Sequence, residues 1–172
     1  MRLQDKVALV TGAGSGFGAG IARRFAAEGA RVVVNDINAA GAQVAEEIRA
    51  AGGRAEFVQA DVTADDWAAM VGATVGKLGR LDIVVNNAGW TNRNKPLLET
   101  TDAEFDRIYA VNVKSVFLSA RHVVPVFRAH GGGCFVNIAS TAGVRPRPGL
   151  TVYNSSKGAV IILSKSMAAE LG

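Results

Sequence analysis

Cysteine is scarce in this sequence, and its scarcity excludes several classes of protein. The 172 residues contain one cysteine, Cys134, so no internal disulfide can form, which is typical of a reducing compartment. The only histidines are His122 and His130, and no cysteine and histidine residues cluster at zinc-ligand spacing. We therefore expect no metal site.

Long apolar runs and clustered basic charge are also missing. No stretch of about 18 apolar residues could span a bilayer. The N-terminus, MRLQDKVALVTG, has too short an apolar run for a signal peptide, so we expect a cytoplasmic protein without a membrane partner. The net charge is +4, but the basic residues are scattered rather than interleaved with aromatic ones. Nucleic acid is therefore not an expected partner.

Short β-branched segments alternate along the chain with longer helical patterns. Strands are expected at 6–10, 31–36, 55–61, 81–89 with its exit turn, and 133–140. Helices are expected at 17–29 (closed by Gly29), 40–53, 64–79 (capped by Thr63), 102–130 (beginning at Thr101 or Asp102 and bent or shortened at Pro125) and 152–171. This alternation predicts an α/β fold in one domain, residues 1–172, with a doubly wound parallel sheet of Rossmann type and helices on both faces. Ligands of such sheets bind beyond the carboxyl ends of the strands.

Glycines follow the first expected strand, in the stretch TGAGSGFG (11–18). Gly12, Gly16 and Gly18 have the spacing G-x-x-x-G-x-G, which lets the main chain turn tightly and approach a ligand closely. The helix that begins here would aim its free N–H groups at a pyrophosphate. No G-K-[ST] follows, which disfavours a nucleoside-triphosphatase loop, and a plain strand-to-helix turn remains the alternative.

Polar residues follow the next three expected strands. Asp36 could accept hydrogen bonds from both ribose hydroxyls and would repel a 2′-phosphate, which favours NAD over NADP; a helix cap is the alternative. Asp61 could reach an adenine amino group, with Val62 on the ring, although a capping role fits Asp61 nearly as well. The stretch NNAG (86–89) would let the backbone pass beneath a cofactor, or it is simply another turn.

Ser140 follows the fifth expected strand, and Tyr153 and Lys157 stand in YNSSK (153–157). Positions four apart share one helix face, so the lysine ammonium would lie near the phenol. A neighbouring cation favours the phenolate form of a tyrosine, which suits general acid–base catalysis. A lone Y-x-x-x-K is usually incidental, but its combination with Ser140 and a nucleotide-binding loop favours a catalytic set.

Together these residues resemble the classical branch of the short-chain dehydrogenase/reductase family over essentially the whole chain. The resemblance rests on TGAGSGFG, Asp36, Asp61-Val62, NNAG, Asn112, Ser140 and YNSSK. It implies the strand order 3-2-1-4-5 and hydride transfer between NAD(H) and a secondary alcohol or ketone. It implies a catalytic set of Asn112, Ser140, Tyr153 and Lys157. It implies a cofactor site of Gly12, Ser15, Gly16, Phe17, Gly18, Asp36, Ile37, Asp61, Val62, Asn87, Ala88, Gly89, Tyr153 and Lys157.

The resemblance also implies a role for each catalytic residue. Tyr153 is the acid/base, and Ser140 positions and polarises the substrate oxygen. Lys157 activates Tyr153 and holds the nicotinamide ribose, and Asn112 holds a water that links Lys157 to solvent. Trp90 is expected either to wall the substrate pocket or to be a partly exposed loop aromatic.

The chain departs from the family in one serious respect, because it stops where two further strands, six and seven, are expected. It is expected to be truncated at the C-terminus relative to the family. The fifth strand, with Cys134, Phe135, Val136 and Ile138, would then lie at an open sheet edge.

Other readings stay open at this point. One is an NADPH-dependent reductase of the 3-oxoacyl-carrier-protein type, which Asp36 disfavours. The other is a dinucleotide-binding module without turnover. Because both helices through which family members associate are present, the resemblance also implies a homo-oligomer, either a dimer or a tetramer.

Overall fold

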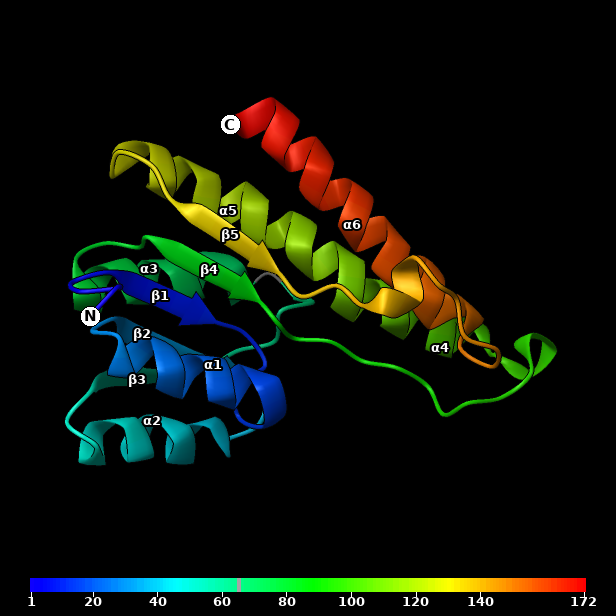
Figure 1. Cartoon of the computed structure of the whole chain (residues 1–172), viewed down its shortest axis with the longest axis horizontal. Coiled ribbons are helices and arrows are strands. Elements are labelled where there is room, and N and C mark those ends of the chain that lie inside the picture. The colour runs from blue at the N-terminus through cyan, green and yellow to red at the C-terminus, as the bar shows by residue number, and fades with distance from the viewer. Residues whose placement is uncertain (65) are drawn as a thin grey trace.

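Within residues 1–64 and 66–172, which the computed structural model describes, five parallel strands form one sheet. The strands are β1 (Val7–Val10), β2 (Arg31–Asp36), β3 (Arg54–Gln59), β4 (Ile83–Asn86) and β5 (Cys134–Asn137). Their order is β3-β2-β1-β4-β5, which confirms the predicted order (Figure 1). The order reverses between β1 and β4, so the carboxyl ends of these two strands flank the switch point at which such sheets bind ligands.

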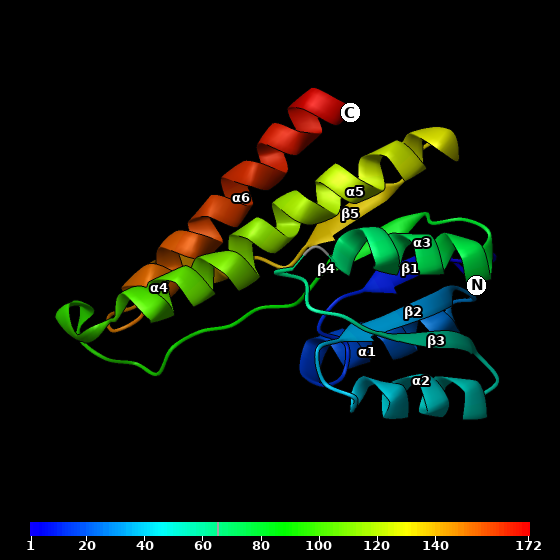
Figure 2. The same ribbon diagram turned by 180° about the vertical axis from the view of Figure 1, so that it is seen from behind.

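Helices cover both faces of the sheet. Figures 1 and 2 show α1 (Gly16–Ala27) and α2 (Gly41–Ala50) on one face, and α3 (Asp66–Leu78) and α5 (Ser115–Ala129) on the other. The helix α4 (Asp102–Tyr109) runs towards α5, and the long helix α6 (Thr151–Leu171) begins beside α4 and diverges from α5 towards its C-terminal end. Two short 3-10 turns, Leu97–Glu99 and Thr141–Gly143, precede α4 and α6.

The apolar strands explain this layered arrangement. All four residues of β1 are fully buried, as expected for a parallel strand with helices on both sides. Leu9 packs with Trp67 and Leu118 on the α3–α5 face, whereas Val10 packs with Val44 on the α1–α2 face. Alternate residues of one strand therefore supply two separate cores.

The predicted long helix over 102–130 is helical throughout but is not one α-helix. It begins with a capping box, in which Thr101 Oγ1 accepts the Glu104 N–H and the Glu104 carboxylate accepts the Thr101 N–H. The residues Ala110–Lys114 then form a π-helical turn that separates α4 from α5. The break is therefore ahead of Pro125, which the sequence had suggested as its cause, and α5 continues through Pro125 to Ala129. A π turn accommodates one extra residue, and no local sequence signal marks it.

The start of α3 is only partly covered by the structure. The prediction placed this helix over 64–79, and residue 65 lies outside the described residues. Thr63, the predicted cap, instead donates its hydroxyl to Asp61 Oδ1 at 2.8 Å, and its N–H donates to the same oxygen. At the first helix, Gly29 closes the turn after α1 as predicted, with φ at +93°.

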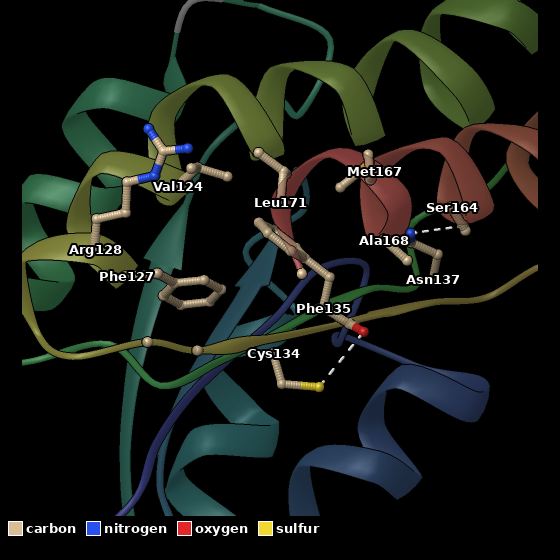
Figure 3. Close-up of a pocket in the computed structure, with 13 residues that line it drawn as sticks. Val124, Phe127, Arg128, Cys134, Phe135, Asn137, Ser164, Met167, Ala168 and Leu171 are labelled. Atoms are coloured by element: carbon tan, nitrogen blue, oxygen red, sulfur yellow. Dashed lines mark hydrogen bonds between the residues drawn. The ribbon is translucent and has the colours of Figure 1, made fainter.

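The strand β5 lies at one edge of the sheet within the described residues, as expected. Cys134 and Val136 are exposed there, whereas Phe135 and Ile138 are partly buried against the two cores. A cavity of about 490 Å³ lies beside this edge, between α5, β5 and the last turns of α6 (Figure 3). Its lining is mostly apolar and contains none of the predicted site residues.

None of the described helices combines the length and the apolar character needed to cross a lipid bilayer.

A buried carboxylate ties the opposite, amino-terminal ends of β1 and β4 together. Asp82 Oδ2 accepts the Val7 N–H at 2.9 Å, and the carboxylate pairs with Arg80. Burial raises the pKa of Asp82, but the hydrogen bonds from Arg80 and Val7 and the charges of Arg80 and Lys6 together hold it below its usual value. This interaction lies far from the carboxyl ends of the strands.

We expect Asp82→Asn to lower the free energy of unfolding by about 1–2 kcal/mol near neutral pH. Because the folded-state pKa of Asp82 is depressed, its contribution is present above the unfolded pKa and is lost as the pH falls through the folded one. Urea unfolding near pH 7 and at acidic pH should therefore give a difference between variant and wild type that shrinks on acidification. A difference independent of pH would contradict this assignment.

Candidate functional site

The carboxyl ends of β1 to β4 open into one cleft of about 580 Å³. The switch point between β1 and β4 lies inside it. The structure brings most of the predicted cofactor residues together in its lining, namely Gly12, Ser15, Gly16, Phe17, Asp36, Ile37, Asp61, Val62, Asn87, Ala88 and Gly89. Residues that are far apart in the sequence therefore share one surface.

The glycine turn after β1 has the tight geometry that its sequence predicts. Gly12 and Gly16 have φ values of +60° and +53°, which favour glycine. A methyl group on Gly18 would collide with the Gly12 carbonyl oxygen and with the Asn87 amide. Gly18 is buried at the start of α1, beneath the cleft rather than in its lining. The turn thus packs against the first residues of α1, and the N-terminal end of α1 lies at the cleft.

The asparagine after β4 locks this turn in place. Asn87 Nδ2 donates to the carbonyl oxygens of Thr11 and Gly12, at 2.9 and 3.0 Å. In return, Thr11 Oγ1 accepts the N–H groups of Asn87 and Ala88. These four hydrogen bonds join the ends of β1 and β4.

Asp36 shapes the cleft at the end of β2. Its Oδ2 accepts the Gly14 N–H at 2.9 Å, and its Oδ1 accepts the Asn38 N–H at 2.9 Å. Asn38 Nδ2 also donates to Oδ1, at 3.4 Å. Oδ2 therefore keeps a free lone pair, and Oδ1 can accept a hydrogen bond from a ligand in place of this long one. The neighbouring side chains of Asn35, Ile37 and Asn38 bring no positive charge to this part of the lining.

Two apolar side chains stand at the open rim of the cleft. Phe17 is 85% exposed and Ile37 is 57% exposed. Exposed apolar side chains at the rim of a cleft are available to cover a bound ligand. Deeper in the cleft, Val62 is buried, and Asp61 is held by its hydrogen bonds with Thr63.

Asn112 lies in the π-helical turn, with 2% of its surface exposed. Its Nδ2 donates to the Trp90 carbonyl and to Ser156 Oγ, both at 3.0 Å. Its Oδ1 accepts the Trp90 N–H at 2.8 Å. Both amide hydrogens are therefore engaged, and one lone pair of Oδ1 is left for another partner.

Tyr153 and Lys157 share a face of α6, as their spacing predicts. Lys157 is buried, its Nζ donates to the Ile138 carbonyl at 2.7 Å, and it lies 5.9 Å from the centre of the Tyr153 ring. Burial lowers the pKa of the Lys157 ammonium below its ordinary value. The arrangement places an ammonium group, poorly screened by solvent, beside a partly exposed phenol.

Ser140 begins the 3-10 turn that follows β5. Its Oγ accepts the Ala142 N–H at 3.1 Å, which leaves its own hydroxyl hydrogen free to donate to a ligand. The turn packs closely on α6, because a methyl group on Gly143 would touch the backbone of Lys157 and Gly158. Ser140 and Lys157 are thereby held in a fixed relation.

The predicted catalytic residues do not line the cofactor cleft, but two of them meet its end. A methyl group on Gly89 would lie 3.5 Å from Asn112 Oδ1 and 3.6 Å from Lys157 Nζ. Gly89 itself lines the cleft, together with Trp90. The cleft therefore leads from the glycine turn to the Asn112 and Lys157 pair.

The family model described as short chain dehydrogenase matches residues 6–172. The chain belongs to the short-chain dehydrogenase family. This membership confirms the resemblance that the sequence motifs suggested.

Relatives of the chain within this family carry the names of dehydrogenases and reductases. A 4-formylbenzenesulfonate dehydrogenase from Comamonas testosteroni is 55% identical over 172 residues, which cover 99% of this chain and 68% of that protein. The crystal structure of a 3-ketoacyl-(acyl-carrier-protein) reductase from Brucella melitensis, complexed with NADH, matches with a TM-score of 0.92 at 46% identity, over 98% of this chain and 70% of that one. A 7α-hydroxysteroid dehydrogenase complexed with NADH and 7-oxo glycochenodeoxycholic acid matches with a TM-score of 0.95 at 42% identity, over 99% of this chain and 67% of that one.

The chain spans about two thirds of the length of these short-chain dehydrogenases. Its relatives' names place it among the oxidoreductases.

Sequence reasoning left several lining residues out of its cofactor site. Arg107, Ala110 and Val111 of the α4 region line the cleft, and the Arg107 guanidinium lies 4.4 Å from the centre of the Trp90 ring. Their spacing of three and four residues, just ahead of Asn112, is the signal that could have identified them. Thr11, the first residue of TGAGSGFG, was not predicted as a site residue; it does not line the cleft, but its hydroxyl accepts the N–H groups that join β1 to β4.

Two glycines of α1 should differ in how well they tolerate a side chain, because Gly18 packs closely against the glycine turn and Gly20 does not. We expect Gly18→Ala to lower the melting temperature by several degrees, because its methyl group meets the Gly12 carbonyl oxygen and the Asn87 amide. Gly20→Ala is the matched control, since nothing lies within 4 Å of its added methyl group and alanine favours the helix. Thermal unfolding should place Gly20→Ala at or above wild type. Equal melting temperatures for the two variants would contradict the packing described here.

Proposed function

We propose that the chain is an NAD(H)-dependent oxidoreductase that transfers hydride between nicotinamide and a secondary alcohol or ketone. The observation that carries this proposal is the meeting of two sites at Gly89. The cleft with the glycine turn ends there, and Asn112 Oδ1 and Lys157 Nζ lie beside the same residue. A dinucleotide in the cleft would therefore bring its reactive end to the predicted catalytic residues.

The residues of the cleft fit a dinucleotide. Gly12 and Gly16, with positive φ values, turn the backbone tightly where it lines the cleft, and the start of α1 offers free N–H groups and a positive dipole end to a pyrophosphate. Ser15, at the cap of α1, has a side chain that makes no capping hydrogen bond and can contact a phosphate. We propose that Asp61 and Val62 hold the adenine and that Asn87 to Gly89 line the path to the nicotinamide.

We propose NAD rather than NADP as the cofactor, because of Asp36. Its carboxylate can accept hydrogen bonds from the ribose hydroxyls, through the free lone pair of Oδ2 and through Oδ1 in place of the 3.4 Å bond from the Asn38 side chain, and it would repel a 2′-phosphate. Within the described lining the cationic side chain is Arg107, which lies against Trp90 instead of beside Asp36. NADH in the solved structures of two relatives is consistent with this preference.

The bound cofactor would supply or accept the hydride, and the protein would handle the proton. We propose that the Tyr153 hydroxyl exchanges this proton with the substrate oxygen. The buried ammonium of Lys157, 5.9 Å from the Tyr153 ring, stabilises the phenolate that forms. The free hydroxyl hydrogen of Ser140 polarises the same substrate oxygen, and Asn112 positions the Trp90 backbone beside the site.

We also propose that the protein is a homo-oligomer. Phe105 stacks on Tyr109 in α4, with ring centres 4.7 Å apart, and Phe105 is 44% exposed. Phe117 of α5 and Ile162 of α6 are exposed as well. Apolar side chains exposed on adjacent helices mark a surface suited to another subunit.

Replacement of Asp36 tests the cofactor preference. We expect Asp36→Ser to raise the dissociation constant for NADH about tenfold or more, because the hydrogen bonds between its carboxylate and the ribose are lost. Binding of NADPH should strengthen in the same variant, because the repelling charge is gone. Titrations monitored by nucleotide fluorescence give both dissociation constants, and their ratio measures the preference for NADH over NADPH.

The matched control for Asp36→Ser is Asp106→Ser, which removes an exposed carboxylate of α4 that does not line the cleft. Its preference for NADH should equal that of wild type. An unchanged ratio in Asp36→Ser would remove the basis for proposing NAD.

Replacement of Tyr153 tests the chemistry. We expect Tyr153→Phe to slow ketone reduction at least about 100-fold and to weaken NADH binding far less, since the variant loses only the hydroxyl that donates the proton. Tyr109→Phe is the control, because Tyr109 is the only other tyrosine and its hydroxyl donates to Ser155 on an outer face. Activity that survives in Tyr153→Phe would overturn the proposed role. Wild-type protein that binds NADH but reduces no ketone would instead be a dinucleotide-binding module.

A further inference from the structure

We propose that the substrate of this site carries an anionic group, a carboxylate or sulfonate, held by Arg93, Arg145 and Arg147. These three exposed side chains are called the arginine rim below. This inference rests on the proposed function and adds the chemical class of the substrate. The established family membership does not assign it.

The arginine rim stands on the two segments that lead away from the proposed catalytic centre. Arg93 follows the end of β4, just beyond Gly89 and Trp90. Arg145 and Arg147 follow the end of β5, on the segment bounded by Ser140 and Tyr153. Ligands bind beyond the carboxyl ends of parallel strands, and both segments leave such ends, so they border the region where a substrate would reach the proposed centre.

Hydrogen bonds bring the two segments together. Asn94 Nδ2 donates to the Pro148 carbonyl at 3.0 Å, and the Lys95 N–H donates to the Gly149 carbonyl at 3.1 Å. Gly149 has a φ of +77°, a conformation that favours glycine at this junction. The two segments that carry the arginines are thereby joined next to Arg93 and Arg147.

The backbone that carries Arg145 and Arg147 is well constrained. The Arg145 N–H donates to the Thr141 carbonyl at 2.8 Å, and Asn154 Nδ2 donates to the Arg147 carbonyl at 2.8 Å. Pro146 and Pro148 flank Arg147 and fix their own φ angles. A constrained backbone reduces the entropy lost when a guanidinium binds a ligand.

The charge around the arginine rim is of one sign. The segments 86–98 and 138–157 contain no aspartate or glutamate. No described carboxylate lies within salt-bridge distance of the three arginines, whereas Lys95 is already paired with Glu104 at 2.6 Å. The next acidic residues along the chain, Glu99 and Asp102, are exposed at the far end of the first segment.

Arginine suits this role because its planar guanidinium matches the geometry of a carboxylate or sulfonate and remains charged at all working pH values. Several like charges without counter-ions also raise the local concentration of an anion at the entrance. A neutral substrate would gain nothing from this arrangement.

A matched pair of ketones tests the proposal, namely 4-acetylbenzoate and 4-acetylbenzamide, which differ in charge but hardly in size. With NADH present, we expect the chain to reduce the benzoate with a KM at least about threefold lower than that of the benzamide. Raising the ionic strength from about 0.05 to 0.5 M should raise the KM of the benzoate alone, because salt screens exposed charges.

Single variants locate the effect. Arg145→Gln, Arg147→Gln and Arg93→Gln should each bring the two KM values closer together, with kcat for the benzamide unchanged. Arg121→Gln, which removes an exposed positive charge from α5, is the matched control and should retain the wild-type preference.

Two failures are distinguishable. Equal KM values for both ketones in the wild type, or a preference that survives all three rim variants, would overturn the inference while leaving the proposed function intact. If neither ketone is reduced, the proposed function fails. The preference is then measured by calorimetric binding of 4-acetylbenzoate and 4-acetylbenzamide in the presence of NADH, and equal or absent binding of the two overturns the inference.

Discussion

The side chain of Asn112 joins three parts of the chain: the π-helical turn, the loop that follows β4, and α6. Its amide accepts a hydrogen bond from the Trp90 N–H and donates to the Trp90 carbonyl, in the loop after β4. It also donates to the Ser156 hydroxyl in α6. A buried amide that lost one of these partners would leave a polar group unsatisfied, at a cost of about 1–3 kcal/mol. Asn112 therefore fixes the backbone next to Gly89 against α6, the helix that also carries Lys157.

The fold could be predicted from the sequence because its signals are local. The apolar run of β1, the β-branched run of β2 and the helical patterns between strands each lie within a short stretch, and their alternation dictates a parallel sheet. The end of α1 is one such local signal, because the chain turns there with a positive φ at Gly29, a conformation that glycine adopts readily. Element ends were less predictable: β3 stops at Gln59 rather than at residue 61, because Asp61 is engaged in a turn with Thr63.

The candidate site could be predicted in its residues but not in its contacts. The motifs named Asp36, Asn87 and Asn112, yet their hydrogen-bond partners Gly14, Thr11 and Trp90 are set by tertiary packing. Arg107 lies against Trp90 across seventeen residues of chain, and no periodicity links an arginine in a helix to an aromatic residue in a loop. The π-helical turn is the clearest omission, since Ala110–Lys114 has an ordinary helical composition. Side-chain networks over long sequence separations are decided by the assembled fold.

That π-helical turn has a consequence for how the chain tolerates change. The extra residue shifts every later position of α5 by about 100° around the helix axis relative to an uninterrupted α-helix. Ile108 before the turn and Val116 and Val123 after it are all buried, and the extra residue brings them close to one face, whereas an uninterrupted α-helix would set Ile108 about 80° away from Val116. Ideal α-helical geometry over the same residues would therefore rotate one of the two helices off its core. The irregular turn thus aligns the buried faces of α4 and α5. Regular helical geometry at this point and good packing of both helices cannot be achieved together.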